Sequence, residues 1–101
     1  MAVLLHPDGS SLDVFPGDGH RFTLEELQAH VGGYYTVVAH QVQNLNGYDI
    51  GIVYVNEEGL LLDLEHNLNA SMIADRHLVG NALVLFQGEQ EEEDEEWHNF
   101  N

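Results

Sequence analysis

The 101-residue sequence contains no lysine and only two arginines, Arg21 and Arg76, against 18 aspartates and glutamates. Its formal net charge is −16 with neutral histidines. Proteins that bind a nucleic-acid backbone need basic side chains to displace counterions, and an anionic membrane surface would repel a chain of this charge. We therefore expect neither direct nucleic-acid binding nor membrane binding.

Cysteine is also absent, which excludes disulfide bonds, thiolate metal sites and cysteine nucleophiles and fits a reducing compartment. The first residues carry no basic charge and are interrupted by Pro7 and Gly9, unlike a secretory signal peptide. No stretch approaches the roughly 20 apolar residues that span a bilayer. We expect a protein of the host-cell cytoplasm.

Capping and turn signals organise the first third of the chain. Short apolar segments at residues 2–6 and 11–15, separated by turn residues, predict a β-hairpin. Thr23 precedes Glu26 at the spacing of a capping box, and Gly32-Gly33 is suited to end a helix. These signals predict two strands followed by a short helix.

β-branched and aromatic residues dominate much of the remaining body. They predict strands at residues 34–43, 51–56, 60–63 and 81–87. Residues 67–78 predict a short helix, with Asn69 as its N-cap and with Met72, Ile73 and Leu78 facing inward. The unbroken apolar centre of the last strand predicts a buried position.

The resulting order is β-β-α-β-β-β-α-β, and tight links between strands favour a mainly antiparallel sheet. We predict an α+β fold, with a small sheet and two short helices on one side of it. Residues 1–88 form a single domain in this interpretation, and residues 89–101 form an acidic C-terminal tail.

Acidic residues are concentrated in the tail but are not confined to it. Residues 89–96 carry seven acids in eight positions, followed by Trp97 and Phe100. Residues 1–88 carry the other eleven acids against two arginines, a charge of 2 − 11 = −9. This pattern fits a solubility tail, adaptation to salt, or a surface that attracts a basic partner.

Four segments carry a resemblance to a known family: Leu24–Tyr34, Val55–Gly59, Asn67–Ser71 and Val79–Val84. In order and spacing they resemble a small domain of bacteriophages, plasmids and their hosts, the domain of unknown function number thirty-eight forty-six. The resemblance covers roughly residues 2–87 and leaves the acidic tail outside. It implies an origin in a mobile element, but it provides no activity and no catalytic residue.

The matched positions have structural interpretations of their own. Gly59 is expected to take a positive φ in a hairpin turn, and Gly80 to allow a close backbone approach. Asn67 and Asn69 are suited to satisfy backbone groups at a turn or cap. We therefore assign these residues to the fold rather than to ligand binding.

Candidate chemistry in the sequence is sparse. The acids and histidines around residues 63–77 offer nitrogen and oxygen ligands, but their spacing matches no metal site that we know. These residues are Asp63, Glu65, His66, Asp75 and His77. No serine lies in a nucleophile elbow, and the Glu57-Glu58 pair in an exposed turn is a poor acid–base pair. We predict no enzyme, catalytic residue, cofactor or metal.

The leading hypothesis is an acidic accessory protein of a phage or mobile element. It would bind a basic surface of a host protein, one that handles nucleic acid, and inhibit or redirect it, with its carboxylates acting as a DNA mimic. The predicted partner-binding residues are Glu25, Glu26, Glu57, Glu58, Glu91, Glu92, Glu93, Asp94, Glu95, Glu96 and Trp97.

The sequence is also compatible with two other functions. A structural phage module would self-associate into a homo-oligomer through the apolar residues Tyr34-Tyr35 and Val53–Val55. A metal- or small-ligand-binding protein would use His66, His77 and the neighbouring carboxylates.

Overall fold

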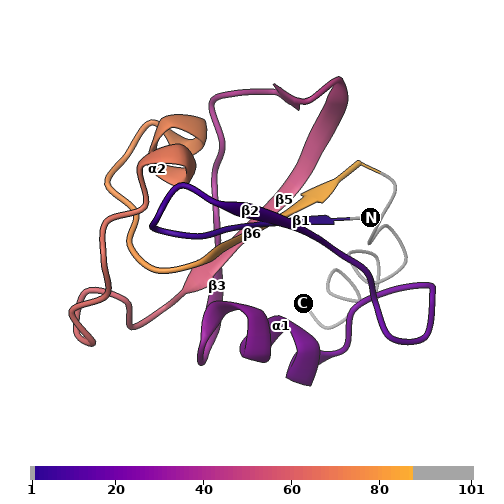
Figure 1. Cartoon of the computed structure of the whole chain (residues 1–101), viewed down its shortest axis with the longest axis horizontal. Helices are drawn as coiled ribbons and strands as arrows, with labels where there is room; N and C mark the ends of the chain where they lie inside the picture. The colour runs from indigo at the N-terminus through magenta and orange to yellow at the C-terminus, as the bar shows by residue number, and fades with distance from the viewer. Residues whose placement is uncertain (1, 88–101) are drawn as a thin grey trace, which may run out of the picture.

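The computed structural model describes residues 2–87, and the predicted acidic tail lies outside them. It contains two helices and six strands, drawn in Figure 1. The strands are β1 (Ala2–Leu5), β2 (Ser11–Val14), β3 (Tyr35–Val38), β4 (Asn44–Leu45), β5 (Tyr48–Asn56) and β6 (Ala82–Phe86). The helices are α1 (Leu24–Val31) and α2 (Leu68–Ala74). The predicted α+β class and the order β-β-α-β-β-β-α-β are confirmed, although β4 was not predicted and takes the place in this order of the predicted strand at 60–63.

The sheet has the strand order β2-β1-β6-β5-β3, and β4 pairs with β5 beside this path. Every pairing between these strands is antiparallel, as predicted. The last strand, β6, lies at the centre, between β1 and β5, and all five of its residues are buried. Its continuous apolar sequence is explained by burial on both of its faces.

The two helices cover opposite faces of the sheet, so the prediction that both lie on one side is wrong (Figure 1). Alternate residues of β1 show the division: Val3 and Leu5 pack with Ile73 of α2, whereas Ala2 and Leu4 pack with residues of α1. Successive strand residues point to opposite faces. Apolar residues at consecutive positions therefore require a cover on each side.

Two predicted strands differ in the structure. Residues 60–63 form no strand but continue the turn that begins at Glu57, in which the Leu62 amide donates to the Glu58 carbonyl. The predicted 34–43 strand ends at Val38, because the chain then leaves the sheet and the Gln41 and Val42 amides donate to Ile73 of α2. Gly59 does not take a positive φ.

Helix α1 follows its sequence signals closely. The Glu26 amide donates to the Thr23 hydroxyl, and the Thr23 amide donates to the Glu26 carboxylate, which completes the predicted capping box. Gly32 ends the helix in the left-handed conformation, with φ of 85°. Leu27 and Val31 are buried against the sheet. Local capping chemistry therefore determines where this helix begins and ends.

The N-cap of helix α2 is Asn67, two residues before the predicted Asn69, and the helix ends at Ala74 rather than at the predicted residue 78. The Asn67 side chain is fully buried and accepts from the Ala70 amide. Its amide nitrogen also donates to the carbonyls of Leu5 and Gly80, at 3.0 and 2.8 Å. Met72 is exposed, against prediction, whereas Ile73 and Leu78 are buried as predicted. No helix among residues 2–87 has the length and apolar character needed to cross a bilayer.

We expect Asn67→Ala to lower the free energy of unfolding by about 2–4 kcal/mol, because it removes a helix cap and leaves two buried carbonyls unsatisfied. The matched control is Asn69→Ala, which removes only an exposed contact of 3.5 Å to the Gly9 carbonyl and should cost less than about 0.5 kcal/mol. Urea unfolding of both variants measures the difference. An equal or larger loss for Asn69→Ala would contradict this assignment of the cap.

Candidate functional site

The surface of the described domain is strongly acidic. Among residues 2–87, every aspartate and glutamate is exposed except Glu26, which is half-buried. These eleven acids face two arginines, so this part of the chain keeps a formal charge of 2 − 11 = −9. The negative charge is therefore a property of the folded surface as well as of the tail sequence.

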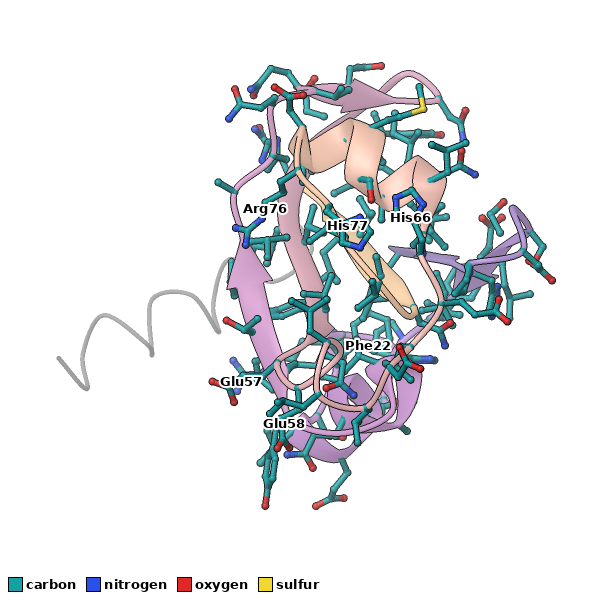
Figure 2. All side chains as sticks on the ribbon, turned by 90° about the vertical axis from the view of Figure 1, so that its left-hand side faces the viewer. Phe22, Glu57, Glu58, His66, Arg76 and His77 are labelled. Atoms are coloured by element: carbon teal, nitrogen blue, oxygen red, sulfur yellow. The ribbon has the colours of Figure 1, made fainter. Side chains whose placement is uncertain are left out.

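The acids predicted to bind a partner fall at two ends of α1. Glu25 and Glu26 lie in its first turn. Glu57 and Glu58 follow β5 and lie near the last turn of α1, because the side-chain nitrogen of Asn56 donates to the Val31 carbonyl. The helix between the two pairs has eight residues and is therefore about 12 Å long. Figure 2 shows Glu57 and Glu58 close together. The predicted residues Glu91 to Trp97 lie outside the described residues.

Glu26 has the structural role that the capping-box spacing predicts, in addition to its predicted role in partner binding. One carboxylate oxygen accepts from the Thr23 amide at 2.9 Å, and the other accepts from the Gly17 amide at 2.8 Å. These bonds lower the pKa of Glu26 below its ordinary value of 4.5, chiefly through Thr23. Its carboxylate therefore fixes the entry to α1, and the capping-box spacing in the sequence was the signal for this role.

Two further acids stabilise turns in the same way. The Asp8 carboxylate accepts from the Ser10 hydroxyl and amide, and the Asp18 carboxylate accepts from the His20 and Arg21 amides. Both sets of bonds lower the pKa of the carboxyl group.

The two histidines of the metal-binding alternative do come together, but without a ligand set. The His66 and His77 rings stack in parallel with their centroids 4.6 Å apart (Figure 2). His66 Nε2 lies 3.1 Å from the Ser71 hydroxyl, which also accepts from the Leu78 amide. Within residues 2–87 no three histidine or acidic side chains are placed to hold a metal ion. This cluster connects α2 to the segment that follows it.

The apolar residues predicted to mediate self-association do not form one surface. Tyr34 is exposed, but Val53, Tyr54 and Val55 are buried in the core. Tyr54 instead packs edge-on against Tyr35 with centroids 5.0 Å apart. Because Val53, Tyr54 and Val55 lie in the core on an inner strand of the sheet, they cannot serve as an exposed interface.

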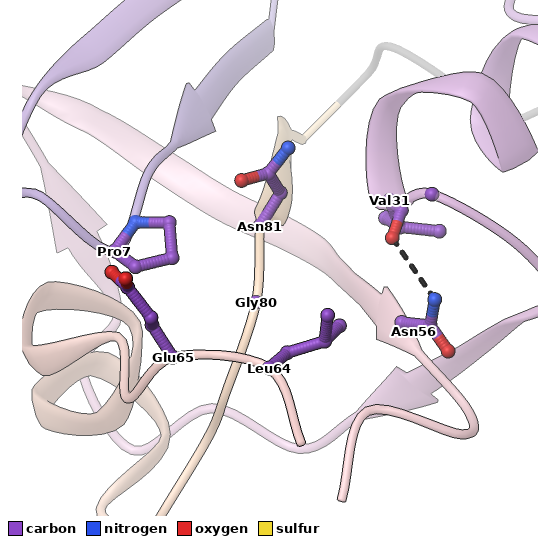
Figure 3. Close-up of a pocket in the computed structure, with 8 residues that line it drawn as sticks. Pro7, Val31, Asn56, Leu64, Glu65, Gly80 and Asn81 are labelled. Atoms are coloured by element: carbon purple, nitrogen blue, oxygen red, sulfur yellow. Dashed lines mark hydrogen bonds between the residues drawn. The ribbon is translucent and has the colours of Figure 1, made fainter. Parts of the chain in front are cut away.

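A pocket of about 310 Å³ lies where the end of α1 meets the chain on either side of α2 (Figure 3). It is lined by Pro7, Val31, Gly32, Asn56, Leu64, Glu65, Gly80 and Asn81. Gly80 has φ of 75°, and a Cβ atom there would lie 2.7 Å from Leu64 Cδ1. Any larger residue at this position would therefore strain the backbone and push Leu64 out of the pocket wall.

Hydrogen bonds determine which polar groups the pocket presents. The Asn56 amide nitrogen donates to the Val31 carbonyl at 3.2 Å, and the Asn81 amide nitrogen donates to the His30 carbonyl at 3.0 Å. Figure 3 shows the Asn81 oxygen turned away from α1, toward the side on which Glu65 and Pro7 lie. The pocket thus combines apolar walls with oxygen acceptors and one carboxylate.

A second groove, of about 370 Å³, lies beside α2 and has no charged side chain in its lining. Its lining residues are Val3, Leu5, Ser11, Val42, Leu45, Asn46, Asn69, Met72 and Ile73. Of these two hollows, the one at Glu65 therefore has the polar groups that can select a ligand by charge.

A family model for a domain of unknown function, DUF3846, matches residues 1–97. The chain belongs to the DUF3846 family. The match extends through Trp97 and includes the acidic run, so the expectation that the tail lies outside the family resemblance is wrong. No curated protein and no solved structure matches the chain.

Three of the segments that carry the resemblance to DUF3846 meet at the pocket beside Glu65. Val31-Gly32 comes from the first, Asn56 from the second and Gly80-Asn81 from the last. Asn67, in the remaining segment, donates to the Gly80 carbonyl directly behind this wall. From the sequence alone, Glu65 was a candidate only as a metal ligand, because these segments are far apart in the chain and meet only in the folded domain.

We expect Glu26→Gln to weaken the dependence of stability on acidic pH. A carboxyl group whose folded pKa is lowered stabilises the fold above its unfolded pKa, and this contribution is lost as the pH falls through the folded value. The free energy of unfolding of the parent protein should therefore decrease as the pH drops below about 4.5, the ordinary pKa of a glutamate. This decrease should be smaller in the variant. Urea unfolding across pH 2–7 measures this; Glu25→Gln, outside the capping box, is the control and should reproduce the parent slope.

Proposed function

We propose that this protein is a non-enzymatic, acidic accessory protein that binds a basic surface of another protein and inhibits or redirects it. The observation that carries the proposal is the unbalanced charge: eleven exposed or half-exposed acids against two arginines within the folded domain. In this proposal the partner is a host protein that handles nucleic acid, met in the cytoplasm. The mobile-element origin implied by the family resemblance fits such a target.

Electrostatic attraction supplies the mechanism. A surface of one charge sign raises the rate of encounter with a surface of the opposite sign, and the effect weakens with ionic strength. Exposed carboxylates also compete with nucleic-acid phosphates for the same arginines and lysines. Glu25, Glu57 and Glu58 expose their carboxylates on the folded domain, and the acids at residues 91–96 add to the same field.

The division of roles among the acids supports this proposal. Asp8, Asp18 and Glu26 hold backbone amides in turns and at a helix start, where an acid has a local structural purpose. Glu57 and Glu58 lie in a turn whose conformation is held by backbone contacts and by the Asn56 side chain, whose Oδ1 accepts from the Glu58 amide at 2.7 Å. Their charge is therefore better explained by interaction with a partner. Trp97 completes the proposed contact surface as an aromatic anchor.

The test is capture of nucleic-acid-binding proteins from host lysate on the immobilised full chain, across 50–500 mM salt. We expect a basic protein to be retained at low salt, released by added duplex DNA, and bound about tenfold more weakly at 200 mM than at 50 mM salt. The triple variant Glu25→Gln, Glu57→Gln, Glu58→Gln should reduce capture strongly.

A control variant separates charge from apolar adhesion. Leu60→Ser with Leu61→Ser changes two residues that are 75% and 83% exposed and leaves the net charge unchanged; it should retain the partner fully. Capture that resists high salt, or that is lost only in the leucine variant, would show that the negative charge is not what binds.

A further inference from the structure

We propose that the pocket beside Glu65 binds one lysine or arginine side chain of the partner. This inference rests on the proposed function, because it supplies the basic partner with a specific point of attachment. The pocket volume of about 310 Å³ lies at the small end of ligand sites. A single side chain fits this size better than a nucleotide or a cofactor.

The polar groups of the pocket favour a cationic donor. Asn81 uses its amide nitrogen on the His30 carbonyl, so that its oxygen remains to accept a hydrogen bond. The Glu65 carboxylate lies on the same side in Figure 3. An ammonium or guanidinium group has only donors and pairs best with a carboxylate and a carbonyl oxygen.

The apolar groups of the pocket suit the rest of such a side chain. Pro7, Val31 and Leu64 line it, and Leu64 and Pro7 are half-buried, which leaves part of their surface for contact. Lysine and arginine pack their methylene stems on apolar surfaces while their charged ends remain at polar groups. An anionic ligand is disfavoured because neither arginine lines the pocket.

The pocket lies next to Glu57 and Glu58, two of the acids proposed to bind a partner. Asn56 lines the pocket and is followed directly by Glu57 and Glu58. Its own side chain holds the end of α1 through Val31 and the start of the turn through the Glu58 amide. A basic residue in the pocket would therefore place its neighbours in the partner next to two exposed carboxylates.

The test uses model side chains, and so needs no partner. The full chain labelled with nitrogen-15 is titrated with Nα-acetyl-lysine N-methylamide, its arginine counterpart, or the uncharged norleucine analogue, while amide shifts are followed by NMR. We expect saturable shifts at Gly32, Glu65, Gly80 and Asn81 with a dissociation constant on the order of 1 mM for a cationic probe. Norleucine should bind about tenfold more weakly or not at all.

Variants locate the binding. Glu65→Gln should weaken binding of the cationic probes about tenfold, and Glu65→Lys should abolish it. Because the Glu65 side chain is exposed, both variants should keep the amide spectrum of the folded parent. Asp13→Asn, which makes the same charge change at an exposed position of β2 outside the pocket, should bind the probes as the parent does.

The outcomes separate this inference from the proposed function. Absence of saturable shifts, equal binding of norleucine, or equal weakening by Asp13→Asn overturns the pocket inference, even if a basic protein is still captured in a salt-sensitive way. Binding of the probes at the pocket, together with failure to capture any basic protein, supports the pocket and overturns the proposed function.

Discussion

The buried side chain of Asn67 is the interaction on which much of this fold depends. It joins the end of β1, the start of α2 and the segment before β6 through three hydrogen bonds. Without these bonds, the Leu5 and Gly80 carbonyls and the Ala70 amide would lose a partner in the interior of the protein, where an unsatisfied polar group destabilises the fold. One amide thus determines where α2 begins and how the chain enters the central strand.

Because Asn67 positions the chain that enters β6, it also affects the packing on both faces of the sheet. Its residues alternate between the two cores, with Leu83 and Leu85 toward α1 and with Ala82, Val84 and Phe86 toward α2. The strand therefore aligns both layers. The segment just before it, Gly80-Asn81, is held by Asn67 on one side and by the end of α1 on the other. The pocket beside Glu65 forms where these two attachments meet the Leu64-Glu65 segment.

Features with local causes could be predicted from the sequence. Thr23, Glu26 and Gly32 determine α1 through contacts within a few residues, and the prediction was confirmed. The choice between Asn67 and Asn69 could not be predicted, because contacts with residues distant in the sequence decide it: Asn67 bonds to Leu5, 62 positions away.

Features that depend on contacts between distant segments of the chain could not be predicted from the sequence either. The three leucines at residues 60–62 resemble a strand, but β6 and β3 already pair with both sides of β5, so they remain in an exposed turn. Placing the helices on opposite faces requires the register of the whole sheet. The pocket is assembled from segments as distant as Pro7 and Asn81, and no spacing in the sequence indicates that they meet.

The acidic surface lowers the stability of the folded domain. Like charges on a small domain repel one another and destabilise the compact state. Asp8, Asp18 and Glu26 offset this cost through bonds to backbone amides, which lower their pKa values. The exposed acids around Glu57 and the pocket have no such role in the contacts described above. The family match also continues through the acidic run to Trp97. A basic surface bound to these exposed acids would neutralise the repulsion between them. Part of the free energy of binding would then come from the relief of this repulsion.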